Sequence, residues 1–260
     1  MRNFLIFSAV LIIITSSVLR ADRRYFARSY TSYTIPAKVL ELEIWNTGKI
    51  QKDQGYYYKW QPRIEFEYGV TDKLTAAIYF NFEEIRSKNN LYTPKSLSFT
   101  STSYELRYRL FEIGEYFIDP TLYAEFYYGG DKVKYEPKIF LTKRYANFIG
   151  VINFNSEIEK NIPTNSTKSE FEITGGLAYE INANFAAGLE FRNHLNFTNV
   201  YDKKVNQAFF MGPTINFQTE KFYFTINLIA QINGTSTNNS RLDLIGHEKY
   251  EIRSILGIEL

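Results

Sequence analysis

Residues 74–82 read Leu74-Thr75-Ala76-Ala77-Ile78-Tyr79-Phe80-Asn81-Phe82, and this stretch decides the fold. Every second residue from the leucine onward is apolar, and threonine, alanine, tyrosine and asparagine fill the positions between. A period of two is that of a β-strand whose two faces meet different surroundings. Residues 185–194 and 222–230 repeat the pattern, so we expect a protein built from amphipathic strands.

Twelve such segments follow one another along the chain. The connections between them alternate between tight turns, as at 71–73 and 182–184, and mostly longer polar stretches, as at 84–101 and 232–248. This alternation is typical of an up-and-down barrel with turns at one rim and loops at the other. The predicted strands are 37–47, 57–70, 74–83, 102–111, 116–128, 132–142, 148–159, 169–181, 185–194, 207–217, 222–231 and 249–260.

The period alone also fits a lipocalin-like soluble barrel or a β-sandwich. The two faces of the strands separate these folds, because one face carries ionic residues on nearly every strand and the other is rich in Phe, Tyr, Leu and Ile. A twelve-stranded lumen is too narrow to pack so many large apolar side chains, whereas a lipid-facing wall can carry them. We therefore predict an all-β, transmembrane, antiparallel up-and-down β-barrel. Pro137 and Pro213 fall inside strands, where each requires a bulge or a lost ladder bond.

Composition narrows the location and the partners. Residues 1–21 carry two arginines and no acid among apolar residues, as a secretory signal peptide does, and the rest of the 260-residue chain has 28 basic and 28 acidic side chains. Balanced charge makes a nucleic acid an unlikely partner, and the absence of cysteine excludes disulfides and thiolate metal sites. We expect an exported protein of a Gram-negative-type outer membrane, with residues 22–36 as an N-terminal segment on the periplasmic side and residues 37–260 as the barrel.

Two stretches carry a resemblance to a known family. Tyr33-Thr34-Ile35-Pro36-Ala37-Lys38 leads into Glu41-Leu42-Glu43-Ile44-Trp45, and Glu65–Leu74 spans a strand, a tight turn and the start of the next strand. Both are similar to a poorly characterised family of bacterial outer-membrane β-barrels, from about residue 30 to the end of the chain. The resemblance implies location and fold, and it brings no agreed activity with it.

The alternation also assigns the residues that face the lumen. We expect Arg192 near the level of Glu172, Arg107 and Arg109 near Asp119, and Arg253 beside Glu41 or Glu43 once the barrel closes. The predicted lumen-lining residues are Glu41, Glu43, Arg63, Glu65, Glu67, Arg107, Arg109, Asp119, Glu125, Lys134, Lys138, Glu172, Glu190, Arg192, Glu251 and Arg253.

Three functions fit this interior. The first is a narrow, charge-lined pore for small polar solutes, and the second is a non-conducting structural or surface-interaction barrel stiffened by salt bridges. The third is an outer-membrane lipid-modifying hydrolase, for which only His194 and His247 could act as bases. A twelve-stranded outer-membrane phospholipase would show His-x-Ser, whereas His194 is followed by Leu195-Asn196. No catalytic motif is found, so the pore is the first prediction and an enzyme the last.

We predict no cofactor and no metal site, since carboxylate pairs such as Glu65 and Glu67 are expected in a charge-balanced wall. The expected partners are outer-membrane lipids and lipopolysaccharide, the barrel-assembly machinery and small polar solutes. The polar loops include lysines such as Lys88 and Lys168, which could contact anionic lipopolysaccharide. Residues 22–36 could hang from the turn side or fold into the barrel, and composition does not decide between these placements.

Overall fold

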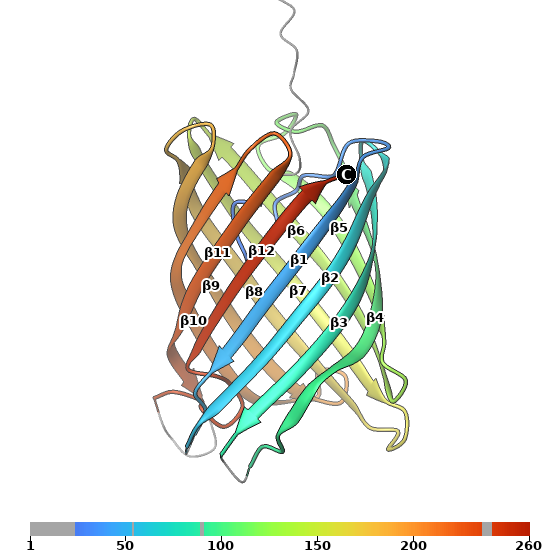
Figure 1. The fold of residues 1–260 in the computed structure, drawn as a ribbon, viewed down its shortest axis with the longest axis vertical. Helices are drawn as coiled ribbons and strands as arrows, with labels where there is room; N and C mark the ends of the chain where they lie inside the picture. Colours follow the sequence, from blue (N-terminus) through green and yellow to red (C-terminus); the bar gives the residue numbers. More distant parts are fainter. Residues whose placement is uncertain (1–23, 54, 89–90, 236–240) are drawn as a thin grey trace, which may run out of the picture.

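The computed structural model describes residues 24–53, 55–88, 91–235 and 241–260, and it forms a closed barrel of twelve antiparallel strands (Figure 1). Each strand pairs with its neighbours in sequence, and β1 pairs with β12 to close the wall. The predicted signal peptide lies outside the described residues. The strands are β1 Leu40–Ile50, β2 Tyr57–Thr71, β3 Leu74–Ser87, β4 Lys95–Arg109, β5 Asp119–Tyr128, β6 Lys132–Tyr145, β7 Phe148–Asn161, β8 Thr167–Glu180, β9 Phe185–Thr198, β10 Lys203–Gln218, β11 Phe222–Thr235 and β12 Tyr250–Glu259.

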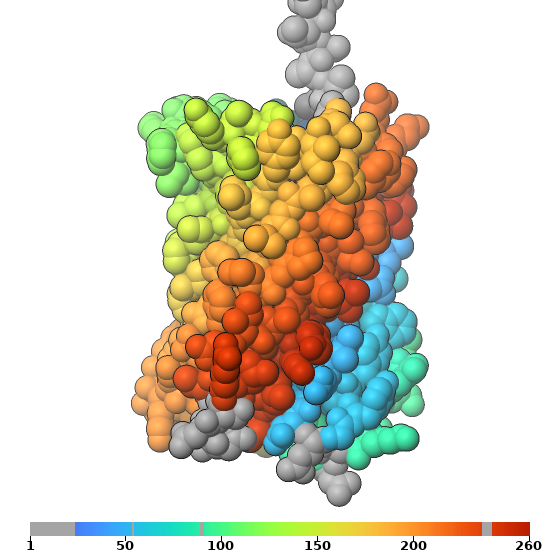
Figure 2. Space-filling view, turned by 90° about the vertical axis from the view of Figure 1, so that its left-hand side faces the viewer, coloured from blue at the N-terminus to red at the C-terminus, as the bar shows by residue number. Residues whose placement is uncertain are grey.

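The apolar face of each strand points away from the lumen, as the sequence predicts. On β11, Phe224 and Leu228 are 39% and 47% exposed, whereas Thr225 and Asn227 between them are almost completely buried. β3 follows the same rule, with Thr75 and Tyr79 buried on the inner side. Mostly polar side chains therefore line the interior, and the outer face is largely apolar. The strands cross this outer surface obliquely, as the bands of colour in Figure 2 show.

Strand lengths differ from the prediction at the loop rim. The predicted loops at 84–101 and 195–206 are largely strand, because β3 and β4 extend to Ser87 and from Lys95, and β9 and β10 are joined by residues 199–202 alone. A strand end that extends beyond the apolar band of the barrel carries polar residues on both faces. The hydrophobic period of two that marks the other strand residues is therefore missing there. The connection at 110–118 on the turn rim is in turn longer than predicted, which weakens the expected contrast between the rims.

Both internal prolines interrupt a ladder on one side only. Pro137 pairs with Ala124 of β5 but has no partner in the β7 register, and Pro213 pairs with Leu189 of β9 but has none in the β11 register. A proline has no N–H to donate, so one neighbouring strand loses its bond at each position. This confirms the predicted disturbance. Among the described residues, no helix is long and apolar enough to cross a membrane.

Candidate functional site: the lumen and its N-terminal segment

Residues 24–36, called here the lumen segment, fold into the barrel at the rim of the tight turns (Figure 1). Phe26, Ala27 and Ile35 have no exposed surface. This answers the question that composition left open. The segment contacts every strand of the wall, and its partners in order from β1 to β12 are Glu43, Glu67, Thr75, Arg109, Thr121, Thr142, Asn153, Glu172, Glu190, Asn216, Thr225 and Glu251.

Glu190 anchors the middle of the segment. Its carboxylate accepts hydrogen bonds from the backbone N–H groups of Ala27, Arg28 and Ser29 at 3.2, 2.8 and 2.7 Å, and from Asn227 Nδ2 at 2.6 Å. The three successive N–H groups stabilise the buried charge of Glu190, and the carboxylate in turn satisfies backbone donors that have no strand partner. Glu190 is therefore both a residue of the barrel wall and a binding partner of the lumen segment.

Ionic contacts hold the segment on either side of this anchor. Arg24 Nε donates to Glu43 Oε1 at 2.8 Å, and Arg28 bridges Glu172 at 2.7 Å and Glu251 at 3.1 Å. Charge-assisted pairs suit a confined interior, because an unpaired buried charge is costly there. Several of the charges that the sequence assigns to the lumen are thus occupied by the chain itself.

Two wall glycines make room for the segment. A side-chain carbon at Gly69 would lie 1.9 Å from the carbonyl oxygen of Pro36, and one at Gly176 would lie 2.4 Å from the ring of Phe26. Both distances are far below van der Waals contact, so only glycine lets the segment approach the wall at these two positions. The wall is therefore shaped to receive it.

Beyond the segment, the loop-side half of the lumen is hollow. This outer vestibule has a volume of about 470 Å³ and adjoins a second cavity of about 570 Å³ with which it shares Lys49, Lys59 and Arg63. Arg28 and Tyr30 of the lumen segment form part of its lining, while Gly246 and His247 belong to the last loop at the other end. The interior is therefore a polar, hollow chamber with the segment at its inner end.

The structure places the predicted lumen residues in two layers. The deeper layer is buried around the lumen segment, and the outer layer lines the vestibule. The deeper layer comprises Glu41, Glu43, Glu65, Glu67, Arg107, Arg109, Asp119 and Glu190. Glu251 is also buried and bonds to Arg28 of the segment, but it lies opposite Lys49, on the loop side of Arg253. The outer layer comprises Arg63, Glu125, Lys134, Lys138, Glu172, Arg192 and Arg253.

Not every predicted neighbour is correct. Arg192 does form an ion pair with Glu172. Arg253 lies opposite Thr47 in the β1 register and contacts Glu251 at 3.7 Å, so the expectation that it lies beside Glu41 or Glu43 is wrong. No turn joins β1 to β12, so their register forms only when the barrel closes, and the alternation along each strand fixes the face of a residue but not its partner.

Arg109 lies opposite Thr121, two residues along β5 from Asp119, and Arg107 lies one step farther, opposite Tyr123. The ion pairs of both arginines go to other carboxylates. Arg107 pairs with Glu67 and Glu105 at 3.1 and 2.8 Å, and Arg109 pairs with Glu112 at 2.9 Å. The carboxylate of Asp119 instead accepts a hydrogen bond from the backbone N–H of Gly114 at 2.7 Å. The longer connection at 110–118 supplies the residues that replace the predicted pairing.

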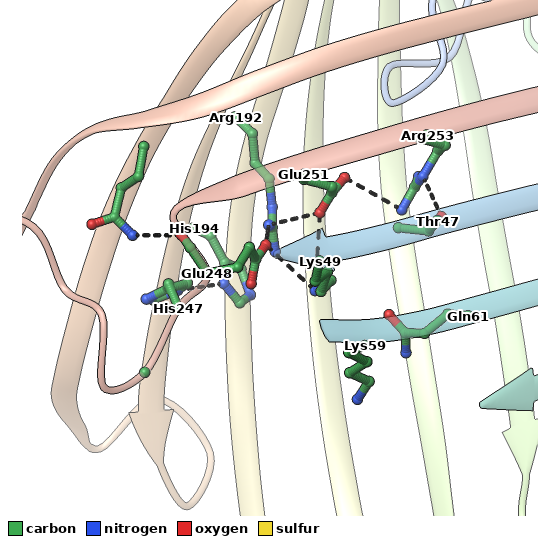
Figure 3. A network of polar contacts seen from close by, with 12 residues as sticks. Thr47, Lys49, Lys59, Gln61, Arg192, His194, His247, Glu248, Glu251 and Arg253 are labelled. Carbon is green, nitrogen blue, oxygen red and sulfur yellow. Dashed lines mark hydrogen bonds and ion pairs between the residues drawn. The ribbon is translucent and has the colours of Figure 1, made fainter. Parts of the chain in front are cut away.

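A chain of four side chains ties the last loop to the wall at the outer rim, and Figure 3 shows the two histidines in its middle. Asp243 Oδ2 lies 2.7 Å from His247 Nδ1, His247 Nε2 lies 2.8 Å from His194 Nδ1, and His194 Nε2 lies 2.8 Å from Glu170 Oε2. Each of the three contacts needs one proton, whereas two neutral histidines carry only two protons. If all three contacts are hydrogen bonds, the chain must therefore carry one additional proton beyond those of two neutral histidines and two ionised carboxylates.

Burial and neighbouring charges keep the additional proton off His247. Burial lowers the pKa of His247 to about 4, and His194 and Arg192 add to this effect against the hydrogen bond to Asp243. His247 is therefore neutral at pH 7. Among the described residues, the partners of the two histidines are carboxylates, an asparagine amide and each other, and neither bonds to a serine, threonine or tyrosine hydroxyl.

One acidic cluster could in principle hold a cation. Oxygens of Glu43, Glu65 and Glu67 lie within 4.8 Å of one another in the deeper layer. Arg24 and Arg107 already pair with Glu43 and Glu67, at 2.8 and 3.1 Å. The chain's own cations thus supply part of the positive charge that a metal would bring.

The family and the fold can now be compared with known proteins. The family model described as "Family of unknown function (DUF6662)" matches residues 19–115 and 112–260. The chain belongs to this family. Its membership confirms the predicted resemblance to a poorly characterised barrel family, and no curated protein matches the chain.

Solved outer-membrane proteins share the barrel. An outer-membrane channel of the COG4313 group from Pseudomonas putida F1 is similar with a TM-score of 0.66 at 10% identity, over 88% of this chain and 98% of that one. The NanC porin gives a TM-score of 0.55 at 12% identity, over 85% and 100% of the two chains. The KdgM porin, solved with disordered oligogalacturonate, gives 0.53 at 8% identity, over 85% and 99%. At these identities the likeness extends to the fold alone.

Proposed function

We propose that this protein is an outer-membrane channel for small polar solutes, kept closed at its inner end by the lumen segment. The observation that carries the proposal is the division of the lumen into a hollow, charged vestibule and a separate plug. The plug is a stretch of irregular chain held by side-chain contacts, so it can leave without breaking any strand pairing in the wall.

The location belongs to the same proposal. The apolar outer surface fits the hydrocarbon layer of a membrane, and the barrels that share the fold include channels and porins of outer membranes. An N-terminal secretory signal would deliver the chain to the periplasm of a Gram-negative-type cell, from which outer-membrane barrels insert.

Conductance of the refolded protein in planar bilayers tests the proposal. The wild-type protein should be closed most of the time, whereas R24Q/R28Q should open at least tenfold more often, because it loses the contacts to Glu43, Glu172 and Glu251. R86Q is the matched control, since Arg86 pairs with Glu84 at an exposed site that does not line the vestibule. A folded R24Q/R28Q variant that gave no current at any voltage would refute the channel.

A second candidate is a non-conducting barrel that binds its ligands at the outer surface. The specific observation in its favour is that the lumen segment contacts all twelve strands, which is more than a loosely held gate requires. The same conductance experiment separates the two, since a permanently sealed barrel gives no current from the wild-type protein or the variant.

A further inference from the structure

The carboxylates that line the outer vestibule are absent from one side of it. Ten lysines and arginines line this cavity against six glutamates. The six glutamates come from β5 to β8 and the last loop, and none of them lies on β12, β1 or β2. Those three adjacent strands contribute Lys49, Lys59, Arg63 and Arg253, together with the neutral groups Thr47 and Gln61 (Figure 3). We call this surface the basic wall.

The register of the strands explains why this wall is crowded with positive charge. Lys49 of β1 lies directly opposite Lys59 of β2, and like charges in such a cross-strand pair repel each other. Lys59 is paired with Glu83 at 2.6 Å. The nearest carboxylate oxygens to Lys49, those of Glu248 and Glu251, lie 3.6 and 3.9 Å away.

The two arginines of the wall have spare donors. Arg63 donates through Nε to Asn81 at 2.8 Å, and among the described residues no carboxylate oxygen lies within 4.0 Å of its guanidinium. Arg253 donates through Nε to Thr47 at 2.9 Å, and its only described carboxylate neighbour, Glu251, is shared with three other cations. Both guanidinium groups therefore present unmatched N–H groups to the cavity that they line.

Both arginines lie at the same aromatic ring. The guanidinium carbons of Arg63 and Arg253 are 5.2 and 5.5 Å from the ring centroid of Trp45, which also lines the vestibule. The two guanidinium groups therefore share one aromatic ring, and Gln61 and Thr47 line the same cavity. Gln61 donates through Nε2 to Glu83 and Thr47 accepts from Arg253, so the amide oxygen of Gln61 and the hydroxyl proton of Thr47 remain for a hydroxyl group of a ligand. Two planar forks beside these groups match a carboxylate on a hydroxyl-bearing body.

We propose that the basic wall binds a small hydroxylated organic carboxylate, with the carboxylate on Arg63 and Arg253 and the hydroxyl groups near Gln61 and Thr47. A cavity of about 470 Å³ is within the range that holds one small molecule. The inference rests on the proposed function only in naming the solute, and binding can be measured without any current.

The tryptophans of the chain offer a direct readout. The sequence has two, and Trp60 donates to Asn46, whereas Trp45 is at the proposed site. The variant W60F therefore leaves Trp45 as the single reporter. Gluconate titrated into W60F in detergent should change the Trp45 fluorescence saturably. Glucose, which is of similar size but uncharged, should cause no change up to a tenfold higher concentration.

The substitutions R63Q and R253Q, each in the W60F background, should weaken gluconate binding at least tenfold. R86Q in the same background should bind as W60F does, because Arg86 does not line the vestibule. Inorganic phosphate distinguishes a carboxylate site from a site for any anion, and gluconate should bind at least tenfold more tightly.

Three results would overturn the assignment: equal binding of glucose, equal binding of phosphate, or unchanged gluconate binding in both folded arginine variants. Saturable binding without conductance would leave the site in place and refute the channel. Conductance without saturable gluconate binding would support the channel and refute the proposed binding site.

Discussion

His247 is the residue whose protonation the structure constrains most clearly outside the strands. Its folded pKa of about 4 is below the ordinary 6.5, so the unfolded chain takes up a proton between these values that the folded chain refuses. The burial of neutral His247 therefore does not lower the stability of the folded protein above about pH 6.5, and the free energy of unfolding decreases as the pH falls from 6.5 toward 4. At about 1.4 kcal/mol per pKa unit, the loss is on the order of 3 kcal/mol.

Thermal unfolding of wild type and H247Q in detergent, at pH 7.5 and 4.5, measures this effect. Wild type should lose more stability between the two pH values than H247Q, because glutamine does not titrate. The carboxylates that do not contact His247 titrate in both proteins and cancel in the comparison, whereas Asp243, whose pKa is lowered by its hydrogen bond to His247, adds to the larger loss of wild type. Equal losses would show that His247 is protonated as readily in the folded barrel as in the unfolded chain.

Side-chain direction is what the sequence predicts best at this scale. The alternation puts Glu190 on the inner face, and it is there, fully buried. It does not predict that Glu190 binds three backbone amides of the lumen segment, because a period of two assigns a face and says nothing of what fills the space in front of it. The available signal was the pair of glycines, Gly69 and Gly176, inside otherwise regular strands.

Among the elements, the lumen segment is the least regular. It forms no strand, and its amides bond to side chains of the wall instead, as with Ser32 N to Thr142 Oγ1 at 2.7 Å. Sequence periodicity cannot detect such a segment. The twelve strands can be detected by periodicity, because each follows the period of two. Their number was predicted correctly.

A covalent lock tests whether the segment is the gate. Ser32 and Thr142 are in contact, and the chain has no cysteine of its own, so S32C/T142C introduces a single disulfide. In the R24Q/R28Q background, the reduced protein should conduct and the oxidised protein should fall to less than a tenth of that current. The two single-cysteine variants are the controls and should not respond to oxidant. An oxidised, cross-linked protein with undiminished current would show that solutes pass elsewhere.

The molecule as a whole combines two surfaces of opposite character across one layer of strands. Leu228 is 47% exposed on the outside of β11, and the next residue but one toward the turn, Ile226, continues that face, while Asn227 between them is buried inside. The hydrophobic face was predictable because lipid imposes it on every strand. The vestibule and its basic wall were not predictable, because they depend on the register by which β12, β1 and β2 bring distant cations together.

A charge placed on the outer face should therefore cost stability only if lipid meets that face. L228K puts an ammonium at the middle of β11, and near the centre of a bilayer this costs about 2–4 kcal/mol. Leu91, which is 62% exposed in the connection between β3 and β4, lies outside the strands, and L91K should cost nothing measurable. Urea titration of folding into lipid vesicles, followed by the shift of the folded band in gel electrophoresis, gives both values. If L228K folded into vesicles as stably as L91K, the outer face of β11 would not be in contact with acyl chains, and the membrane-spanning barrel would have to be abandoned.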